Sequence, residues 1–139
     1  MISKTFSTIL LASVFLTGCA GSANDRILQG GNQLELRSMQ TRGFETEDIN
    51  MVTRTVIATL QDLNFVIDKA DADLGVISGT KLDGYRIKMS VTVRAKTQTM
   101  MAVRANATYN LEPIEDVGLY QDFFSSLGKA MFLTANQID

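Results

Sequence analysis

Two neighbouring segments of the chain, residues 85–96 and 101–112, alternate between apolar and polar residues with a period of two. Successive side chains of a β-strand point to opposite faces of its sheet, so the pattern predicts two strands with one buried and one solvated face. The rest of the chain must then cover the apolar face of an antiparallel sheet. The residues predicted to face the core are Tyr85, Ile87, Met89, Val91, Val93 and Ala95 in the first strand and Met101, Val103, Ala105, Ala107, Tyr109 and Leu111 in the second.

The strongest turn signal in the chain, Asp83-Gly84, lies just before the first of these strands. A two-residue loop at this dipeptide predicts a hairpin in which Leu82 pairs with Tyr85 and Lys81 lies opposite Arg86. The register then continues along both strands. Its further pairs are Thr80 with Ile87, Ser78 with Met89 and Val76 with Val91.

The register between the two alternating strands follows from their shared apolar face, because a slip of one residue would turn a whole strand inside out. This requirement excludes a two-residue loop. One of the remaining registers would place Arg94 directly opposite Arg104, which is a repulsive pair. We therefore predict Arg94 opposite Ala102, Thr92 opposite Arg104, and a three-residue loop at Thr97-Gln98-Thr99.

Two amphipathic helices are predicted to cover the apolar face of the sheet. The first begins at Thr46 as its N-cap, has acidic residues in its first turn, and ends near Asn64 as a left-handed C-cap. The second follows Asp116 as a cap, and Gly128 within it indicates a close approach of the helix to the sheet. Apolar residues at spacings of three and four, expected to face the core, are Ile49, Val52, Val56, Leu60 and Leu63 in the first helix and Tyr120, Phe123, Phe124, Leu127 and Met131 in the second.

The remaining strands have weaker patterns. Residues 34–42 alternate loosely and predict a first strand that ends at Gly43, and residues 65–82 form one strand region that acids interrupt at 70–73. Together the elements predict an α+β fold, a two-layer sandwich in the order β-α-β-β-β-α. Its mostly antiparallel four-stranded sheet would carry two helices on one face. Residues 33–139 are then a single α+β domain, long enough to bury its own core.

The N-terminal end of the chain has a different character. Lys4 precedes an apolar run over residues 6–16, and Leu16-Thr17-Gly18-Cys19 follows at once. The run is too short to span a bilayer comfortably and is typical of a signal peptide, here residues 1–18. The sequence Leu-x-Gly-Cys at the end of such a run resembles the lipobox of bacterial lipoproteins.

That resemblance implies a lipidation site at Cys19, with a diacylglycerol on its thiol and a further acyl chain, such as palmitate, on its amine. Three acyl chains anchor a protein to a membrane permanently. In Gram-negative lipoproteins an Asp after this cysteine favours the inner membrane, so Ala20 implies the outer membrane, with the domain in the periplasm. Residues 19–32 lack periodicity and predict a flexible tether of about 20 Å behind the lipidated cysteine.

Arrangements of residues typical of enzyme active sites are missing from the sequence. There is no histidine, and Cys19 is the only cysteine, which excludes histidine-based triads, histidine metal sites and an intramolecular disulfide. Asp68, Asp71 and Asp73 suggest calcium, but they lack the central Gly and distal Glu of an EF-hand loop, so we interpret them as a solvated connector. We expect no metal, no cofactor and no enzymatic activity. Catalysis by carboxylates alone would require two acids in one concave pocket.

Basic residues gather on the predicted solvated face of the sheet. A formal net charge of −2, which becomes more negative without Lys4, gives no reason to expect a nucleic acid partner. The lack of aromatic residues on this face also argues against nucleic acid. The alternatives are a face that keeps the sheet soluble, or a binding surface for an acidic protein or an anionic lipid or glycan. The candidate binding residues are Lys81, Arg86, Lys88, Arg94 and Arg104.

The segment from Arg42 to Lys81 resembles a group of small uncharacterised Gram-negative outer-membrane lipoproteins. The similarity lies in Arg-Gly-Phe-Glu-Thr-Glu-Asp at its start, in residues 60–65 and in residues 74–77. The element order is also similar, in topology only, to helix-grip domains of lipoprotein subunits in the outer-membrane β-barrel assembly machine. Neither resemblance supplies an activity. The anchor, the short tether, the one-domain size and the missing catalytic groups lead us to expect an accessory or scaffold subunit of an envelope complex. The alternative hypothesis is a binder of anionic envelope lipid or glycan.

Overall fold

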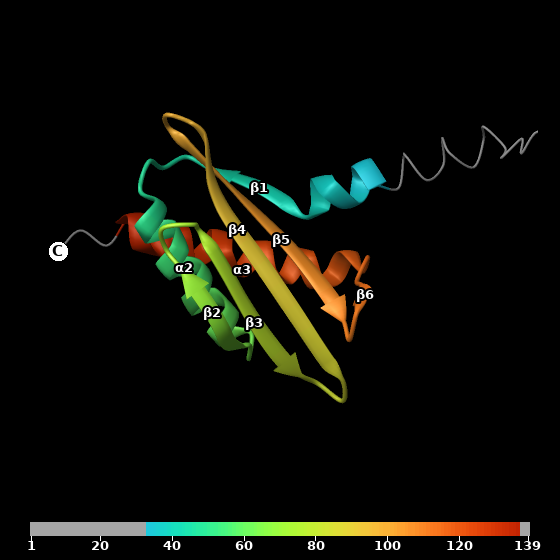
Figure 1. Cartoon of the computed structure of the whole chain (residues 1–139). Helices are drawn as coiled ribbons and strands as arrows, with labels where there is room; N and C mark the ends of the chain where they lie inside the picture. The colour runs from blue at the N-terminus through green and yellow to red at the C-terminus, as the bar shows by residue number, and fades with distance from the viewer. Residues whose placement is uncertain (1–32, 137–139) are drawn as a thin grey trace, which may run out of the picture.

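An open, antiparallel six-stranded sheet carries two long helices on one face (Figure 1). The structure, a computed structural model, describes residues 33–136. The expected signal peptide, Cys19 and the tether therefore lie outside the described residues. The elements are β1 (Thr41–Phe44), α2 (Ile49–Asp62), β2 (Val66–Asp71), β3 (Val76–Leu82), β4 (Arg86–Thr97), β5 (Met100–Tyr109), β6 (Glu112–Pro113) and α3 (Val117–Asn136).

The strand order is β1-β5-β4-β3-β2, and the short β6 also pairs with β5. The predicted α+β class is confirmed, but the prediction of four strands is wrong. Residues 65–82 are not one strand. They form the hairpin β2–β3, because the backbone turns at Gly75, which has a positive φ of 60°. The Asp71 carboxylate stabilises this turn by accepting a hydrogen bond from the backbone N–H of Leu74 at 3.0 Å.

The first segment also differs from the prediction. Residues 33–39 are helical, and the strand that follows, β1, contains Gly43 instead of ending before it. Leu36 packs against the core from this helix, and its carbonyl accepts a hydrogen bond from the backbone N–H of Gln40 at 2.9 Å. The loose alternation of residues 34–42 was therefore a poor guide, since a helix with a single core contact can produce it.

The helix α2 begins two residues later than predicted. Its N-cap is Asp48, whose side chain accepts a hydrogen bond from the backbone N–H of Met51 at 2.9 Å. Thr46, the predicted N-cap, instead stabilises the turn before the helix, because its hydroxyl accepts a hydrogen bond from the backbone N–H of Asp48 at 3.2 Å. No acidic residue lies in the first turn of α2, contrary to the prediction. At the other end the C-cap is Leu63 and not Asn64, but Asn64, the next residue, has the predicted left-handed conformation, with a positive φ of 66°.

The core lies between the sheet and the two helices. Both predicted apolar stripes contribute to it, although Ile49 and Leu63 of the first are only half-buried, and the aromatic stripe of α3 is core as expected. The core cluster is Val52, Val56, Leu60, Phe65, Ile77, Met89, Val91, Val93, Met101, Val103, Ala105, Ala107, Tyr120, Phe123, Phe124, Leu127 and Met131.

The β3–β4 hairpin is shifted by one residue from the predicted register. Leu82 pairs with Arg86, so the loop has three residues, and Gly84 within it has a positive φ of 70°. A shift of one residue reverses the two faces of a strand. Ile77, Gly79 and Lys81 therefore lie on the helix-covered face of β3. The residues predicted for that face, Val76, Ser78, Thr80 and Leu82, lie on the other.

The β4–β5 register is confirmed. Arg94 lies opposite Ala102 and Thr92 lies opposite Arg104. The loop is shorter than predicted, because Thr97 still pairs with Met100. A register irregularity between Ala95 and Thr97 absorbs the difference, as a β-bulge does.

The outer edge of β5 is shared by β1 and β6, and a buried tyrosine joins the two. The Tyr120 hydroxyl donates to the carbonyl of Ile114 at 2.7 Å and accepts from the backbone N–H of Ala107 at 3.1 Å. It also accepts from the Gln40 side chain, at 3.1 Å. The backbone N–H of Ala105 donates to the Gln40 carbonyl at 2.9 Å. The Tyr120 hydroxyl thus pairs backbone groups in the gap between the two short strands.

Gly128 does not mark the close approach of helix to sheet that we predicted. A Cβ atom at this position would meet no atom within 4 Å. Gly128→Ala should therefore stabilise the protein, by about 1 kcal/mol, because alanine favours the helix and nothing obstructs its methyl group. The urea midpoint of unfolding measures this. Ala130→Gly, in the same helix, should shift the midpoint by a similar amount in the opposite direction, and a lower midpoint for Gly128→Ala would contradict the argument.

Candidate functional site

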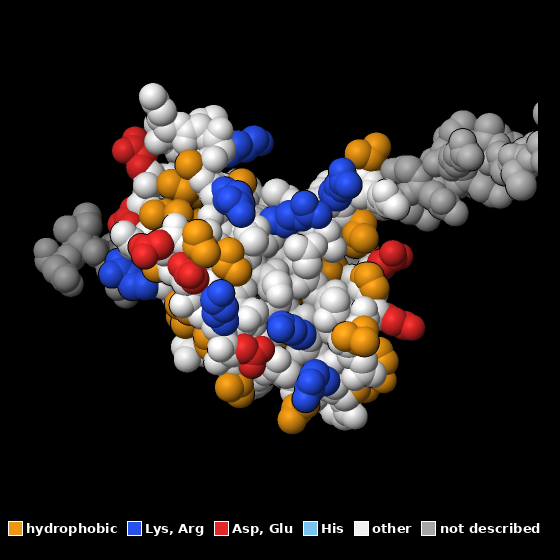
Figure 2. Space-filling view, viewed as in Figure 1, with side chains coloured by type: hydrophobic (Ala, Val, Ile, Leu, Met, Phe, Trp, Pro, Cys, Tyr) orange, Lys and Arg blue, Asp and Glu red, His pale blue; other side chains and the backbone are white. Residues whose placement is uncertain are grey.

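The first candidate surface is the side of the sheet that the helices leave uncovered, here called the open face. Four of the five predicted binding residues lie on it, because they alternate with the core residues of β4 and β5. All four side chains are exposed. Figure 2 views this face and shows Lys and Arg side chains distributed across it. The four residues are Arg86, Lys88, Arg94 and Arg104.

Lys81 is the exception, and its assignment to this face is wrong. The one-residue shift of the β3–β4 hairpin pairs it with Ile87 and turns it toward the helix side of the sheet. There its side chain is 28% exposed and its ammonium lies 3.9 Å from the Asp83 carboxylate. The predicted repulsive pair of Lys81 with Arg86 does not form.

The basic side chains of the open face lie among small polar residues. Arg94 and Arg104 are diagonal neighbours across the β4–β5 ladder, the arrangement in which long side chains can still reach each other. Within residues 33–136, neither of them lies within 4.0 Å of a carboxylate. At the β2 edge the Asp68 carboxylate accepts a hydrogen bond from the Thr80 hydroxyl at 2.6 Å. The open face is therefore basic over β4 and β5 and mixed over β2.

A shallow hollow of about 370 Å³ lies on the open face. Of the predicted binding residues only Arg86 lines it. Val66 and Leu82 contribute exposed apolar surface, with 72% and 78% of their area accessible. We missed these two because we placed Leu82 on the core face. The hollow combines one guanidinium group with apolar walls. Its lining residues are Asn64, Val66, Thr80, Leu82 and Arg86.

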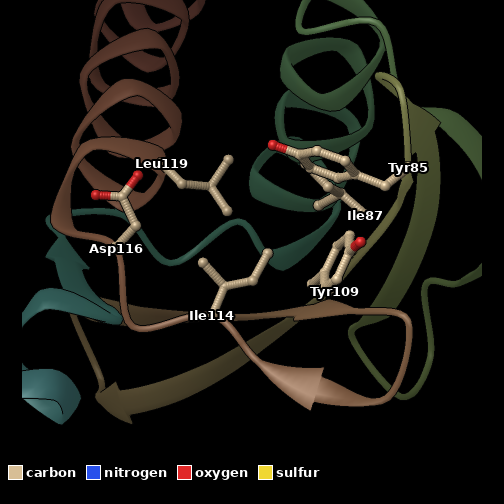
Figure 3. Close-up of a pocket in the computed structure, with 6 residues that line it drawn as sticks. All are labelled: Tyr85, Ile87, Tyr109, Ile114, Asp116 and Leu119. Atoms are coloured by element: carbon tan, nitrogen blue, oxygen red, sulfur yellow. The ribbon is translucent and has the colours of Figure 1, made fainter.

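The second candidate surface, here called the end pocket, is a cavity of about 430 Å³ at one end of the sheet. It lies where β4 begins, β5 ends and the chain enters α3. In Figure 3 the two tyrosines stand on one side of the cavity and Asp116 on the other. The tyrosine rings meet edge to face, with centroids 4.7 Å apart and planes at 89°. The lining residues are Tyr85, Ile87, Tyr109, Ile114, Asp116 and Leu119.

Large apolar side chains at or near the hairpin turns at this end of the sheet are exposed. Leu82 is 78% exposed, Tyr85 54%, Tyr109 39% and Leu111 94%. We predicted the last three as core residues from their alternation. They lie beyond the ends of the covering helices, and Leu111 sits at the tip of the β5–β6 turn, where Asn110 has a positive φ of 52°. The sequence did contain a signal for these exposed residues, because both apolar patterns continue as far as the turns that end the strands.

One acidic residue, Asp116, lines the α3 side of the end pocket, and two more are close to it in the sequence. Asp116 caps α3 as predicted, since its carboxylate accepts a hydrogen bond from the backbone N–H of Gly118 at 3.2 Å. Glu112 pairs with Tyr109 in the β5–β6 ladder, and Glu115 precedes Asp116 in the chain. Glu115 also lines a separate hollow of about 210 Å³ with Glu35. Both glutamates are exposed there, and we assign the pair no chemical role.

Two of the three acids considered for calcium accept hydrogen bonds within the structure. Asp68 holds the Thr80 hydroxyl and Asp71 holds the Leu74 amide, each through one carboxylate oxygen. Among residues 33–136 no group of three or more His, Cys, Asp or Glu side chains is arranged to hold a metal ion.

In the described part of the chain, no helix has the length and apolarity required to cross a membrane. Comparison with known protein families and with curated proteins finds no match for the chain.

Proposed function

We propose that this chain is a non-enzymatic outer-membrane lipoprotein, anchored through Cys19, that acts as an accessory or scaffold subunit of an envelope complex. The observation that supports a protein partner is the end pocket with its exposed apolar rim. A cavity of about 430 Å³ is lined there by the exposed Tyr85 and Tyr109, and the exposed Leu82 and Leu111 belong to the neighbouring hairpin ends. Clustered apolar surface of this kind marks interaction sites on folded proteins, whereas isolated exposed apolar residues do not.

The rim residues are of the type that supplies binding energy. Tyrosine is enriched among the residues that dominate protein–protein interfaces, because its ring offers a large contact area at low cost in conformational entropy. Each square ångström of apolar surface removed from water contributes about 25 cal/mol. Binding of a partner at the end pocket would therefore be favourable, because it removes from water apolar surface that stays exposed in the isolated domain.

The anchor is tested by Cys19→Ser. Because no other cysteine is available, the substitution should abolish incorporation of labelled palmitate and move the protein from the membrane fraction to the soluble fraction. Fractionation of the outer membrane checks the localisation. Ala20→Asp is the matched variant, and it should retain lipid but shift the protein toward the inner membrane. Palmitate incorporation by Cys19→Ser would overturn the assignment of the anchor.

The partner is tested by photocrosslinking in intact cells. A photoreactive amino acid at Tyr85 or Leu111 should give an adduct with the same envelope protein at both positions. Asn50 on α2 is an exposed control position distant in sequence from the end pocket and should not give that adduct. Failure to obtain an adduct at Tyr85 and Leu111, or an equal yield at Asn50, would contradict a binding role for the end pocket.

A second candidate function is the binding of anionic envelope lipid or glycan by the open face. It is favoured by the position of Arg86, Lys88, Arg94 and Arg104 on one uncovered face. Arg94→Glu combined with Arg104→Glu should abolish most binding to vesicles that contain lipopolysaccharide, and binding by the unmodified protein should weaken as salt is added. Arg54→Glu combined with Lys129→Glu changes the net charge equally on α2 and α3. Equal binding by the two double variants would exclude a specific role for the open face.

A further inference from the structure

The end pocket has a chemical preference that its apolar rim alone does not define. We propose that it accepts a peptide segment in which an aromatic or branched aliphatic side chain is followed closely by Lys or Arg. This inference rests on the proposed function, because it specifies the partner of the same surface. Two independent observations support it, the shape and lining of the cavity and the charge along one side.

The cavity is suited to a large apolar side chain. Its volume of about 430 Å³ lies in the lower range of ligand pockets. Ile87, Ile114 and Leu119 form its apolar walls. Tyr85 and Tyr109 meet edge to face, so their rings present surfaces on which a further aromatic ring can pack.

The charge beside the cavity selects a cation. Asp116 lines the cavity directly and is exposed. Its carboxylate is engaged with the Gly118 amide through Oδ1, which leaves Oδ2 for a second donor. Glu112 and Glu115 add negative charge on the same segment of chain. The nearby Lys81 is held by Asp83, with 3.9 Å between ammonium and carboxylate.

The tyrosines and the Asp116 carboxylate lie on opposite sides of the cavity, so the apolar side chain packs on the rings while the cation binds the carboxylate. An anionic lipid would meet the Asp116 carboxylate as a like charge and would be disfavoured in this cavity. The open face, on the other side of the sheet, has the opposite charge preference.

Binding of labelled peptides to the full lipidated protein, held in nanodiscs of phosphatidylcholine, tests the proposal. The probe is a short Gly/Ser peptide that contains Phe-Lys. One comparison peptide contains Phe-Glu and the other contains Ser-Lys. Loss of the aromatic ring should weaken binding about tenfold, the scale of a dominant interface residue. Replacement of Lys by Glu in the peptide should weaken binding about two- to fivefold, the scale of an exposed ion pair.

Asp116→Asn is the decisive variant, because asparagine caps a helix as well as aspartate does and α3 should stay intact. It should remove the preference for Phe-Lys over Phe-Glu. Asp122→Asn, on the exposed side of α3, is the matched control and should keep it. Tyr85→Ser, in an exposed turn, should weaken both Phe peptides equally and provides a second test that does not depend on the cap.

The two proposals fail in different ways. Equal binding of Phe-Lys and Phe-Glu, or no binding of either, would overturn the peptide preference. Crosslinks from Tyr85 to one envelope protein in cells would then still support the protein partner. Loss of those crosslinks would instead overturn the proposed function itself. Binding of Phe-Lys that Asp116→Asn leaves unchanged would place the peptide elsewhere and also overturn the proposal.

Discussion

Gly75→Ala should lower the free energy of unfolding by about 4 kcal/mol, the sum of a left-handed backbone penalty and a steric clash. Gly75 has a positive φ of 60°, which an L-residue with a Cβ atom rarely adopts. An alanine Cβ would lie 2.3 Å from the backbone carbonyl oxygen of Val93. Since that oxygen belongs to the central strand β4, it cannot move aside as the end of a flexible side chain would.

The carbonyl of Gly75 adds to this cost. It accepts a hydrogen bond from the backbone N–H of Val93 at 2.7 Å, so the residue that would clash is also the one that Gly75 binds. Separation of the two strands to admit a methyl group would weaken this bond. The free energy of unfolding of a typical domain is only about 5–15 kcal/mol, so the loss expected for Gly75→Ala is a large fraction of it.

Urea denaturation followed by circular dichroism measures the effect. Gly84→Ala is the matched control, because Gly84 also has a positive φ, of 70°, but a Cβ atom there would meet nothing within 4 Å. It should cost only the conformational part, about 1–2 kcal/mol. Equal losses for the two variants would show that the contact with Val93 contributes nothing.

Tyr120→Phe should lower the free energy of unfolding by about 2–3 kcal/mol, because it leaves the buried Ala107 N–H and the partly buried Ile114 carbonyl without partners. The ring of Tyr120 is fully buried, and phenylalanine would keep its packing. Only the hydroxyl is lost. The N–H of Ala107 and the carbonyl of Ile114 would each lose the hydrogen bond described above, and the Gln40 amide would lose an acceptor.

Two measurements separate this explanation from a general loosening of the core. The urea midpoint should fall, and the Ala107 amide should exchange its hydrogen faster than that of its cross-strand neighbour Met89. Tyr109→Phe is the control, because Tyr109 lies in β5 with Ala107 but is 39% exposed. Its free energy of unfolding should change by no more than about 0.5 kcal/mol. An unchanged midpoint for Tyr120→Phe would contradict the role of the hydroxyl.

The parts of the fold that could be predicted are those in which one rule dominates. In β4 and β5 the period of two and the rejection of an Arg94–Arg104 pair lead to the correct register. The α3 stripe from Tyr120 to Met131 repeats regularly enough to define the buried face of the helix. In these elements a change of face would expose many large apolar side chains at once.

The failures lie where the pattern allows two solutions. Val76 and Ile77 are both apolar, so β3 contains no alternation that would choose its buried face. Asp83-Gly84 is compatible with a loop of two or three residues, and the difference moves Lys81 across the sheet. Four of the five candidate basic residues were therefore assigned to the correct face of the sheet, because they lie on β4 and β5, where the alternation is clear.

The end pocket could not be predicted for a different reason. Tyr85, Tyr109 and Leu111 continue apolar patterns that are core further along each strand. Whether such residues are buried depends on how far the helices reach over the sheet, and this length is a property of tertiary packing. A single-sequence pattern has no access to it.

The sharing of the β5 edge has a mechanical consequence. The sheet from β2 to β6 is a series of hairpins between consecutive strands, whereas β1 reaches β5 across most of the domain, with Thr41 opposite Arg104. In the sequence, β1 is also the strand nearest the proposed anchor at Cys19. A pull on that anchor, balanced by a partner at the end pocket, would pass through the edge between β1 and β5, and we expect it to detach β1, along with Gln40 from Tyr120, before it separates the longer hairpins. The chain released when β1 detaches would lengthen the connection to the membrane and lower the tension on the binding surface.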